Sequence, residues 1–197
     1  EINNYNYVIY AKNSKYTSSG ISTDTASIGN YIIPPYSQDF STAASANGYL
    51  VLDKDSDNKT WNYSDEWNAF ECRPGNDSSD DWLLTPFFKL EGSRSYQLSF
   101  RAWSPLSYYK EKFHLAYGTG DDPTSYTLLG DTINLNSTDG DDRNISLEIK
   151  TTADGLYRIG FHNISDAGWE AYTTVIDNIK VEPLAYYEAP DSATSFK

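Results

Sequence analysis

The chain has 197 residues, with 28 acidic and 15 basic side chains, a net charge of −13 at neutral pH, one Cys and no Met. This charge argues against nucleic acids and anionic membrane surfaces as partners, because both attract local positive charge. A single Cys excludes an intramolecular disulfide, and no apolar run approaches the roughly 18 residues of a membrane-spanning helix, so we expect no direct membrane insertion. A chain that begins with Glu and lacks Met is expected to be processed or cut from a longer protein.

Residues 1–34 are expected to form an appendage to the main domain. They contain two short candidate strands, 5–13 and 20–28, and two strands cannot bury a core of their own. The two prolines of Ile33-Pro34-Pro35-Tyr36 favour an extended, stiff junction. Residues 1–35 have a formal charge of zero, so the acidity of the chain belongs to the residues after position 35.

The central region, residues 35–182, alternates apolar and polar side chains over short segments, as half-buried strands do. Turn-forming Asp, Gly, Asn and Pro separate these segments, and helical periodicity is sustained nowhere. The pattern predicts an all-β, mostly antiparallel sandwich or jelly roll. The side chains expected to face its core are Tyr96, Leu98, Phe100 and Ala102; Phe113, Leu115 and Tyr117; Ile145, Leu147 and Ile149; Tyr157, Ile159 and Phe161; and Val175, Asp177, Ile179 and Val181.

Residues 183–197 close the chain and have the composition of a linker. Pro183 and the run Glu188-Ala189-Pro190-Asp191-Ser192 favour extended, solvated backbone. We expect this segment to lead into a following domain.

Five segments in sequence order resemble the cleaved-adhesin, or choice-of-anchor J, domain of bacterial surface proteins. They are Pro35 to Phe40 followed by Gly48 to Trp61, Asp80-Asp81-Trp82-Leu83-Leu84-Thr85-Pro86, Arg158 to Asn163 and Val175 to Val181. The resemblance covers residues 35–182 and implies a jelly-roll β-sandwich of the galactose-binding-like or MAM-like kind. It also implies a non-catalytic module of a secreted or surface-anchored multidomain protein, in which a structural calcium is common.

The two ends resemble pieces of fibronectin type III domains. Residues 5–13 and 20–28 are similar to the last two strands of such a domain, and residues 189–197 are similar to the start of another. The resemblance implies neighbouring domains of the same chain as partners.

Asp177 is the first candidate metal ligand. Its position places a carboxylate on an apolar strand face, where an unpaired charge is costly. The resemblance makes calcium the leading cation, with Asp39 and nearby loop carbonyls as further ligands. The alternative is a structural acid that is capped by hydrogen bonds or faces water, and Ser41 stands where the family often has a further acid.

Asp53, Asp55 and Asp57 form a second candidate site, because their spacing matches the first half of an EF-hand loop. The match is incomplete, since Asn58 stands in place of the turn Gly and Ser64 in place of the bidentate Glu. The alternatives are a solvated acidic loop and a cation site of another type.

Trp103, Tyr108, Tyr109 and Trp169 are candidate ligand-binding residues. They lie in polar neighbourhoods, and an amphipathic aromatic ring can stack on a sugar while neighbouring polar groups bind its hydroxyls. The alternative for each ring is edge packing or contact with another domain.

Catalysis is not supported by any motif. His114 and His162 take the outward parity of their strands, and neither G-x-S-x-G nor H-E-x-x-H occurs. We therefore expect a non-catalytic extracellular module that binds glycans or protein surfaces and is stabilised by a cation. Two alternatives stay open: a structural spacer between fibronectin-like domains, and an accessory domain of a secreted hydrolase.

Overall fold

The computed structural model describes residues 3–5, 8–9, 21–22, 26–28, 31–75, 78–106, 109–135, 142–166 and 171–184. The chain divides into two compact units, residues 1–31 and 32–197. Two of the candidate ligand-binding residues, Tyr108 and Trp169, lie outside the described residues, as does most of the expected C-terminal linker.

The first unit contains two antiparallel strand pairs. Strand β1 (Asn3–Tyr5) pairs with β4 (Ala26–Ile28), and β2 (Val8–Ile9) pairs with β3 (Ile21–Ser22). The two pairings are nested, since β2 and β3 lie between β1 and β4 along the chain. Its assignment to a fibronectin type III domain stays a prediction.

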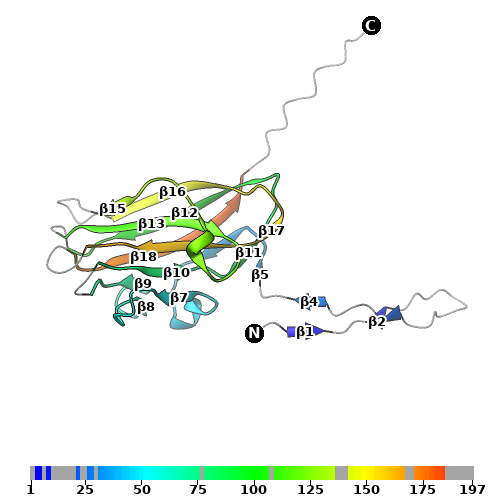
Figure 1. Ribbon diagram of the computed structural model, residues 1–197, viewed down its shortest axis with the longest axis horizontal. Coiled ribbons are helices and arrows are strands. Elements are labelled where there is room, and N and C mark those ends of the chain that lie inside the picture. Colours follow the sequence, from blue (N-terminus) through cyan, green and yellow to red (C-terminus); the bar gives the residue numbers. More distant parts are fainter. Residues whose placement is uncertain are drawn as a thin grey trace, which may run out of the picture. The chain divides into compact units, whose positions relative to one another are not determined.

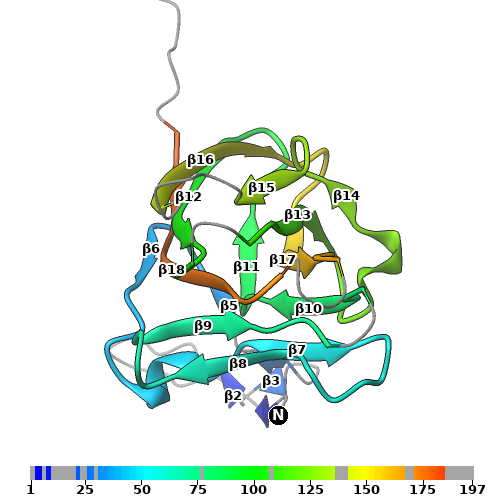
Figure 2. The same cartoon turned by 90° about the vertical axis from the view of Figure 1, so that its left-hand side faces the viewer.

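The second unit is a sandwich of two antiparallel sheets, seen edge-on in Figure 2 and from the side in Figure 1. One sheet has eight strands: β14 (Thr127–Leu128), β13 (Glu111–Gly118), β17 (Gly155–Asn163), β10 (Asp81–Leu84) and β7 (Leu50–Asp53) in this order, with β11 (Phe87–Leu90), β15 (Ile133–Leu135) and β5 (Tyr31–Ile32) attached. The other has six: β16 (Asp142–Lys150), β12 (Ser95–Trp103), β18 (Thr174–Pro183), β9 (Ala69–Cys72) and β8 (Trp61–Ser64), with β6 (Tyr36–Gln38) beside β18. The predicted all-β jelly roll is confirmed.

The described residues include two short 3-10 helices, η1 (Ala43–Ala46) and η2 (Pro123–Ser125). Within the part of the chain that the structure describes, no helix has the length and apolar character to cross a membrane.

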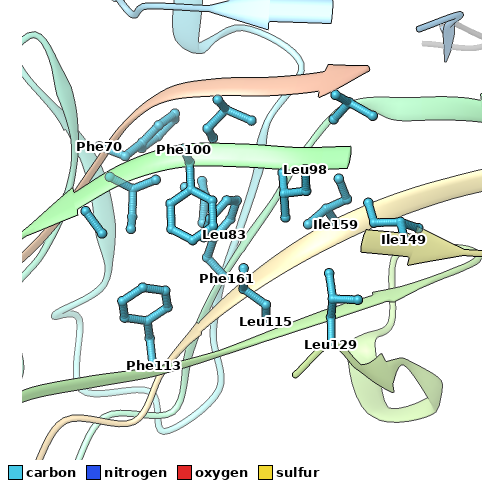
Figure 3. Close-up of a cluster of buried hydrophobic side chains, with 14 of the residues drawn as sticks. Phe70, Leu83, Leu98, Phe100, Phe113, Leu115, Leu129, Ile149, Ile159 and Phe161 are labelled. Carbon is cyan, nitrogen blue, oxygen red and sulfur yellow. The ribbon is translucent and has the colours of Figure 1, made fainter. Parts of the chain in front are cut away.

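The core lies between the two sheets, and Figure 3 shows its side chains converging from both. Tyr96, Leu98, Phe100 and Ala102 of β12 are all buried there, as their alternation predicts. The inward rows of β13 and β17 meet them, and Phe100 packs edge-on against Phe161 with ring centres 5.1 Å apart. Burial therefore confirms the predicted faces of these strands.

The predicted face of β18 is wrong in its first half. Ile179 and Val181 point into the core, but Val175 and Asp177 pair in register with Trp103 and Arg101 on the outer face of the sheet. The pairing shifts between Ser99 and Arg101 of β12, where Asn178 of β18 takes a positive φ of 53°. A bulge adds a residue to one strand and so reverses the parity of everything beyond it.

Candidate functional site

The acidic loop after β7 brings three carboxylates together. Asp53, Asp55 and Asp57 each place an oxygen within 4.8 Å of the others. Among the described residues, this is the one group of three or more acidic, His or Cys side chains that converges in this way. The structure does not add Asp39 or Asp177 to it.

Backbone hydrogen bonds hold these carboxylates in place. The donors are the N–H groups of Ser56 (2.6 Å) and Asn58 (3.0 Å) to Asp53, of Asp57 to Asp55 (3.2 Å), of Lys59 to Asp57 (2.6 Å) and of Asp80 to Asp55 (3.2 Å). Such Asx turns fold a loop around its own side chains. The loop therefore carries its charge in a fixed arrangement.

Two local features allow the tight fold of the acidic loop. Asn58 takes a φ of 63°, so it adopts the left-handed conformation that the Gly of an EF-hand would supply, and Asn tolerates it better than most residues. Gly75 packs against Asp57, because a Cβ there would lie 1.6 Å from the Oδ2 of Asp57. A side chain at position 75 would displace this carboxylate from its place in the loop.

Asp81 lies behind the acidic loop and was not among the candidate residues. It pairs with Asp53 across β7 and β10, which lie side by side in Figure 2, and it has no exposed surface. The Cys72 thiol donates to its Oδ2 (3.8 Å), while its Oδ1 has no hydrogen-bond partner. Burial is the main cause that raises the pKa of Asp81 to about 7, and the negative charges of Asp55, Asp53 and Asp57 add to it. A buried carboxylate that has one oxygen without a hydrogen-bond partner and lies beside three other carboxylates favours a cation.

The alternation of side-chain directions along a strand could have identified Asp81 as an inward-facing residue. Asp81 shares the parity of Leu83, which is fully buried in the core, so its carboxylate had to point inward. In the sequence it was grouped with its neighbour Asp80 as part of a motif, and only the strand pairing places it next to Asp53.

Asp177 and Asp39 form a separate acidic pair. Asp177 is 7% exposed, and both its carboxylate oxygens accept hydrogen bonds from Asn178, from the backbone N (2.6 Å) and from Nδ2 (3.0 Å). Burial is the main cause of its raised pKa, and the charge of Asp39 adds to the effect while Arg101 opposes it. Asp39 is exposed, and the backbone N–H of Ser41 lowers its pKa. The pairing of Gln38 with Ile179 between β6 and β18 places Asp39 close to Asp177.

Trp103 is largely covered by other side chains. It is 8% exposed and packs edge-on against Trp67, with ring centres 6.3 Å apart. The Arg101 guanidinium lies 4.3 Å from the centre of the Trp103 ring and makes a bidentate salt bridge to Asp142. Little of the Trp103 ring is left for a ligand to stack on.

Tyr109 has a more open setting. Its ring stacks on that of Tyr172 at 5.4 Å and 25°, and both residues are partly exposed. The Arg73 guanidinium lies 5.5 Å from the centre of the Tyr172 ring. This pair of stacked rings has an adjacent cation, and Tyr172 was not among the sequence candidates.

Two of the pockets on the described surface are large enough for a small ligand. One, of about 590 Å³, lies between β15 and β16 and is lined by Asp131, Thr132, Ile133, Asn134, Arg143, Ile145 and Leu147. The other, of about 410 Å³, is lined by Asn58, Lys59, Thr60, Asn62, Glu71 and Arg73. Neither pocket has an aromatic ring in its wall, so neither offers a stacking platform for a sugar.

Cys72 has the environment of a structural residue. It is fully buried, and burial together with the charge of Asp81 holds the pKa of its thiol well above the ordinary range. A thiol that stays protonated and out of contact with solvent is a poor nucleophile.

Solved structures with a similar fold include adhesin and carbohydrate-binding domains. The K1 cleaved adhesin domain of Lys-gingipain from Porphyromonas gingivalis W83 matches with a TM-score of 0.61 at 15% identity, over 77% of this chain and 99% of that domain. The K3 domain of the same protein matches with a TM-score of 0.60 at 15% identity, over 75% and 96%. This chain has their jelly-roll fold.

A carbohydrate-binding domain also shares this fold. The CBM22-1 xylan-binding domain of Paenibacillus barcinonensis Xyn10C matches with a TM-score of 0.53 at 5% identity, over 77% of this chain and 94% of that domain. Identities this low establish a common fold and nothing finer. No protein-family model matches the sequence, and no curated protein sequence matches it.

Proposed function

We propose that this chain carries a non-catalytic, extracellular binding module for glycans or protein surfaces, at residues 35–182 of a multidomain bacterial surface protein. The observation that carries the proposal is the jelly-roll fold, which spans nearly the whole of the K1 adhesin domain. Residues 1–34 and 183–197 then belong to neighbouring fibronectin-like domains and linkers. Because a fold hosts many functions, the proposal depends on the surface as well.

The contact surface in this proposal is centred on Tyr109 and Tyr172. Their stacked, partly exposed rings and the adjacent Arg73 provide an apolar plane with a cation at its edge. Aromatic planes of this kind bind the C–H face of a sugar, and Arg adds hydrogen bonds to its hydroxyls. Tyr108 and Trp169 are the further residues that we assign to this surface.

Calcium is the cation that we assign to the acidic loop. All the candidate ligands are oxygens, and Ca²⁺ takes six to eight of them in irregular cages. Asp53, Asp55 and Asp57 would bind the ion directly, while the unpaired Oδ1 of buried Asp81 fits a charge at this place. Asp39 and Asp177 remain our proposal for a second, separate cation position.

A structural spacer is the second candidate function. Two observations favour it: Trp103 is mostly covered, and the two described pockets contain no aromatic ring. A spacer would need the cation for rigidity but no ligand surface.

A glycan array distinguishes the two functions. We expect the whole chain to bind a subset of glycans and Tyr109→Ala or Tyr172→Ala to lose that binding, because each variant removes one ring of the stack. Leu156→Ala is the matched control, since it removes an exposed apolar side chain elsewhere. Absence of binding to glycans and to extracellular protein ligands would leave the spacer, and binding that survives both Tyr variants would reject the proposed surface.

A further inference from the structure

The only two histidines of the sequence lie opposite each other in the folded chain. His114 of β13 pairs in register with His162 of β17, and these strands run side by side (Figure 1). Both side chains are on the outer face of the eight-stranded sheet, away from Leu115 and Phe161 in the core. Their ring centres are 6.2 Å apart and their planes are tilted by 43°.

Each ring is held by a contact that uses one of its nitrogens. The Nε2 of His162 lies 2.7 Å from the Oδ1 of Asp80, and the ring stacks on Trp82 at 4.1 Å and 11°. The Nδ1 of His114 lies 3.3 Å from the Oγ1 of Thr132. A metal would therefore be bound by the opposite nitrogens, the Nδ1 of His162 and the Nε2 of His114.

The spacing of the rings suits a shared metal. Zinc binds imidazole nitrogen at about 2.0–2.1 Å, so two imidazoles on one ion have ring centres roughly 5–6 Å apart. The observed 6.2 Å needs only a small side-chain rotation to reach this range. Asp80 adds the carboxylate contact that commonly orients a metal-binding His.

Nearby charges do not oppose a cation at this place. Lys112 shares the outer face of β13, two residues before His114, but its ammonium makes a 2.5 Å salt bridge to Asp166. Asp80 contributes a negative charge directly beside His162. The charged side chains Lys112, Asp166 and Asp80 therefore give the surroundings of the two imidazoles a net negative charge.

We propose that His114 and His162 form a binding site for a divalent transition metal such as Zn²⁺, with Asp80 positioning His162 and water completing the coordination. Its nitrogen ligands differ from the oxygens of the acidic loop, so the two places select different metals: borderline-soft ions here and hard Ca²⁺ there. A bound ion would join β13 to β17 and, through Asp80, to the start of β10.

Isothermal titration of the untagged whole chain with ZnCl₂, in excess CaCl₂ to occupy the acidic loop, tests the site. We expect one Zn²⁺ per chain. His114→Ala and His162→Ala should each weaken binding at least tenfold, and Asp80→Asn should weaken it by about 10–100-fold, as the loss of an orienting partner commonly does. Asp65→Asn, an exposed acid in the β8–β9 turn, is the control and should leave Zn²⁺ binding unchanged.

Quenching of tryptophan fluorescence gives a second readout. The Trp82 ring stacks on His162, so Cu²⁺ or Ni²⁺ bound there should quench it, and Trp82→Phe should remove that quenching while the other four of the five tryptophans report little change. His114→Gln replaces His114→Ala if the smaller side chain alters the circular dichroism spectrum. Absence of Zn²⁺ binding by the natural chain, His variants that titrate like it, or loss of binding in Asp65→Asn would each overturn the proposal.

Discussion

Replacement of Asp81 by Asn tests whether this buried carboxylate needs a cation. Burial and three neighbouring carboxylates raise its pKa from 3.8 to about 7. At about 1.36 kcal/mol per pKa unit, ionised Asp81 costs the cation-free fold up to about 4 kcal/mol above pH 7. Asn removes the charge and keeps the shape, but its buried amide donor costs about 1–3 kcal/mol if unpaired. We therefore expect Asp81→Asn to stabilise the calcium-free protein by about 1–3 kcal/mol at pH 7.5.

Asp81 makes the free energy of unfolding fall as the pH rises. Because the folded-state pKa of Asp81 is raised, the native chain keeps a proton that the unfolded chain has already lost between about pH 4 and pH 7. The contribution of Asp81 to the free energy of unfolding is therefore greatest below about pH 4 and is lost as the pH rises through 7. In Asp81→Asn this part of the pH dependence should be missing.

Urea unfolding, followed by circular dichroism between pH 4 and pH 8, measures both effects. In EDTA the variant should be the more stable protein at pH 7.5. In CaCl₂ at 100 times its dissociation constant, the natural chain should gain about 2.7 kcal/mol and the variant clearly less. Asp65→Asn, an exposed acid in the β8–β9 turn, is the control and should change neither value. An Asp81→Asn protein that is less stable than the natural chain in EDTA, or that gains as much from calcium, would refute the reasoning.

Local geometry supports three further predictions. Gly75→Ala should displace the Asp57 carboxylate, because its Cβ would lie 1.6 Å from Oδ2, and should reduce the rise in melting temperature on calcium addition; an unchanged rise would contradict this. Phe161→Ala should cost about 3–5 kcal/mol in urea unfolding, since it leaves a cavity beside Phe100, and a cost below about 1 kcal/mol would mean that the core is not packed as described. Asn178→Ala should cost about 1–2 kcal/mol in the same assay, whereas Asn178→Gly should cost less, because the φ of 53° strains a residue with a Cβ; equal costs would remove backbone strain as the cause.

Strand faces could be predicted wherever the alternation ran without interruption. In β12, Tyr96, Leu98 and Phe100 are all buried because a strand turns each side chain to the face opposite its neighbour's. The same rule failed in β18, where the bulge at Asn178 moves Asp177 to the outer face. A bulge depends on pairing with a partner strand, so the sequence of one strand does not reveal it.

Candidate site residues that are close in sequence could be predicted, whereas those brought together by folding could not. Asp53, Asp55 and Asp57 were found by their spacing, because a loop of so few residues must bring its own side chains together. Asp81 and Tyr172 were missed, since their neighbours Asp53 and Tyr109 come from distant parts of the chain. The sequence also did not reveal which side chains are exposed. It made Trp103 a candidate stacking residue, but in the structure Trp67 and Arg101 cover its ring.

The length, charge and residue alternation by themselves determined an acidic all-β chain, the core-facing rows of its uninterrupted strands and an oxygen-rich acidic loop, because these depend on neighbours in sequence. The outward position of His114 and His162 was also settled by parity alone. Only the tertiary structure decided that the two rings lie opposite each other, that Asp81 is buried behind the acidic loop with its Oδ1 unpartnered, and that Asp177 faces outward. Each of these depends on the register between strands, which is fixed when the two sheets pack and not by the sequence within any one strand.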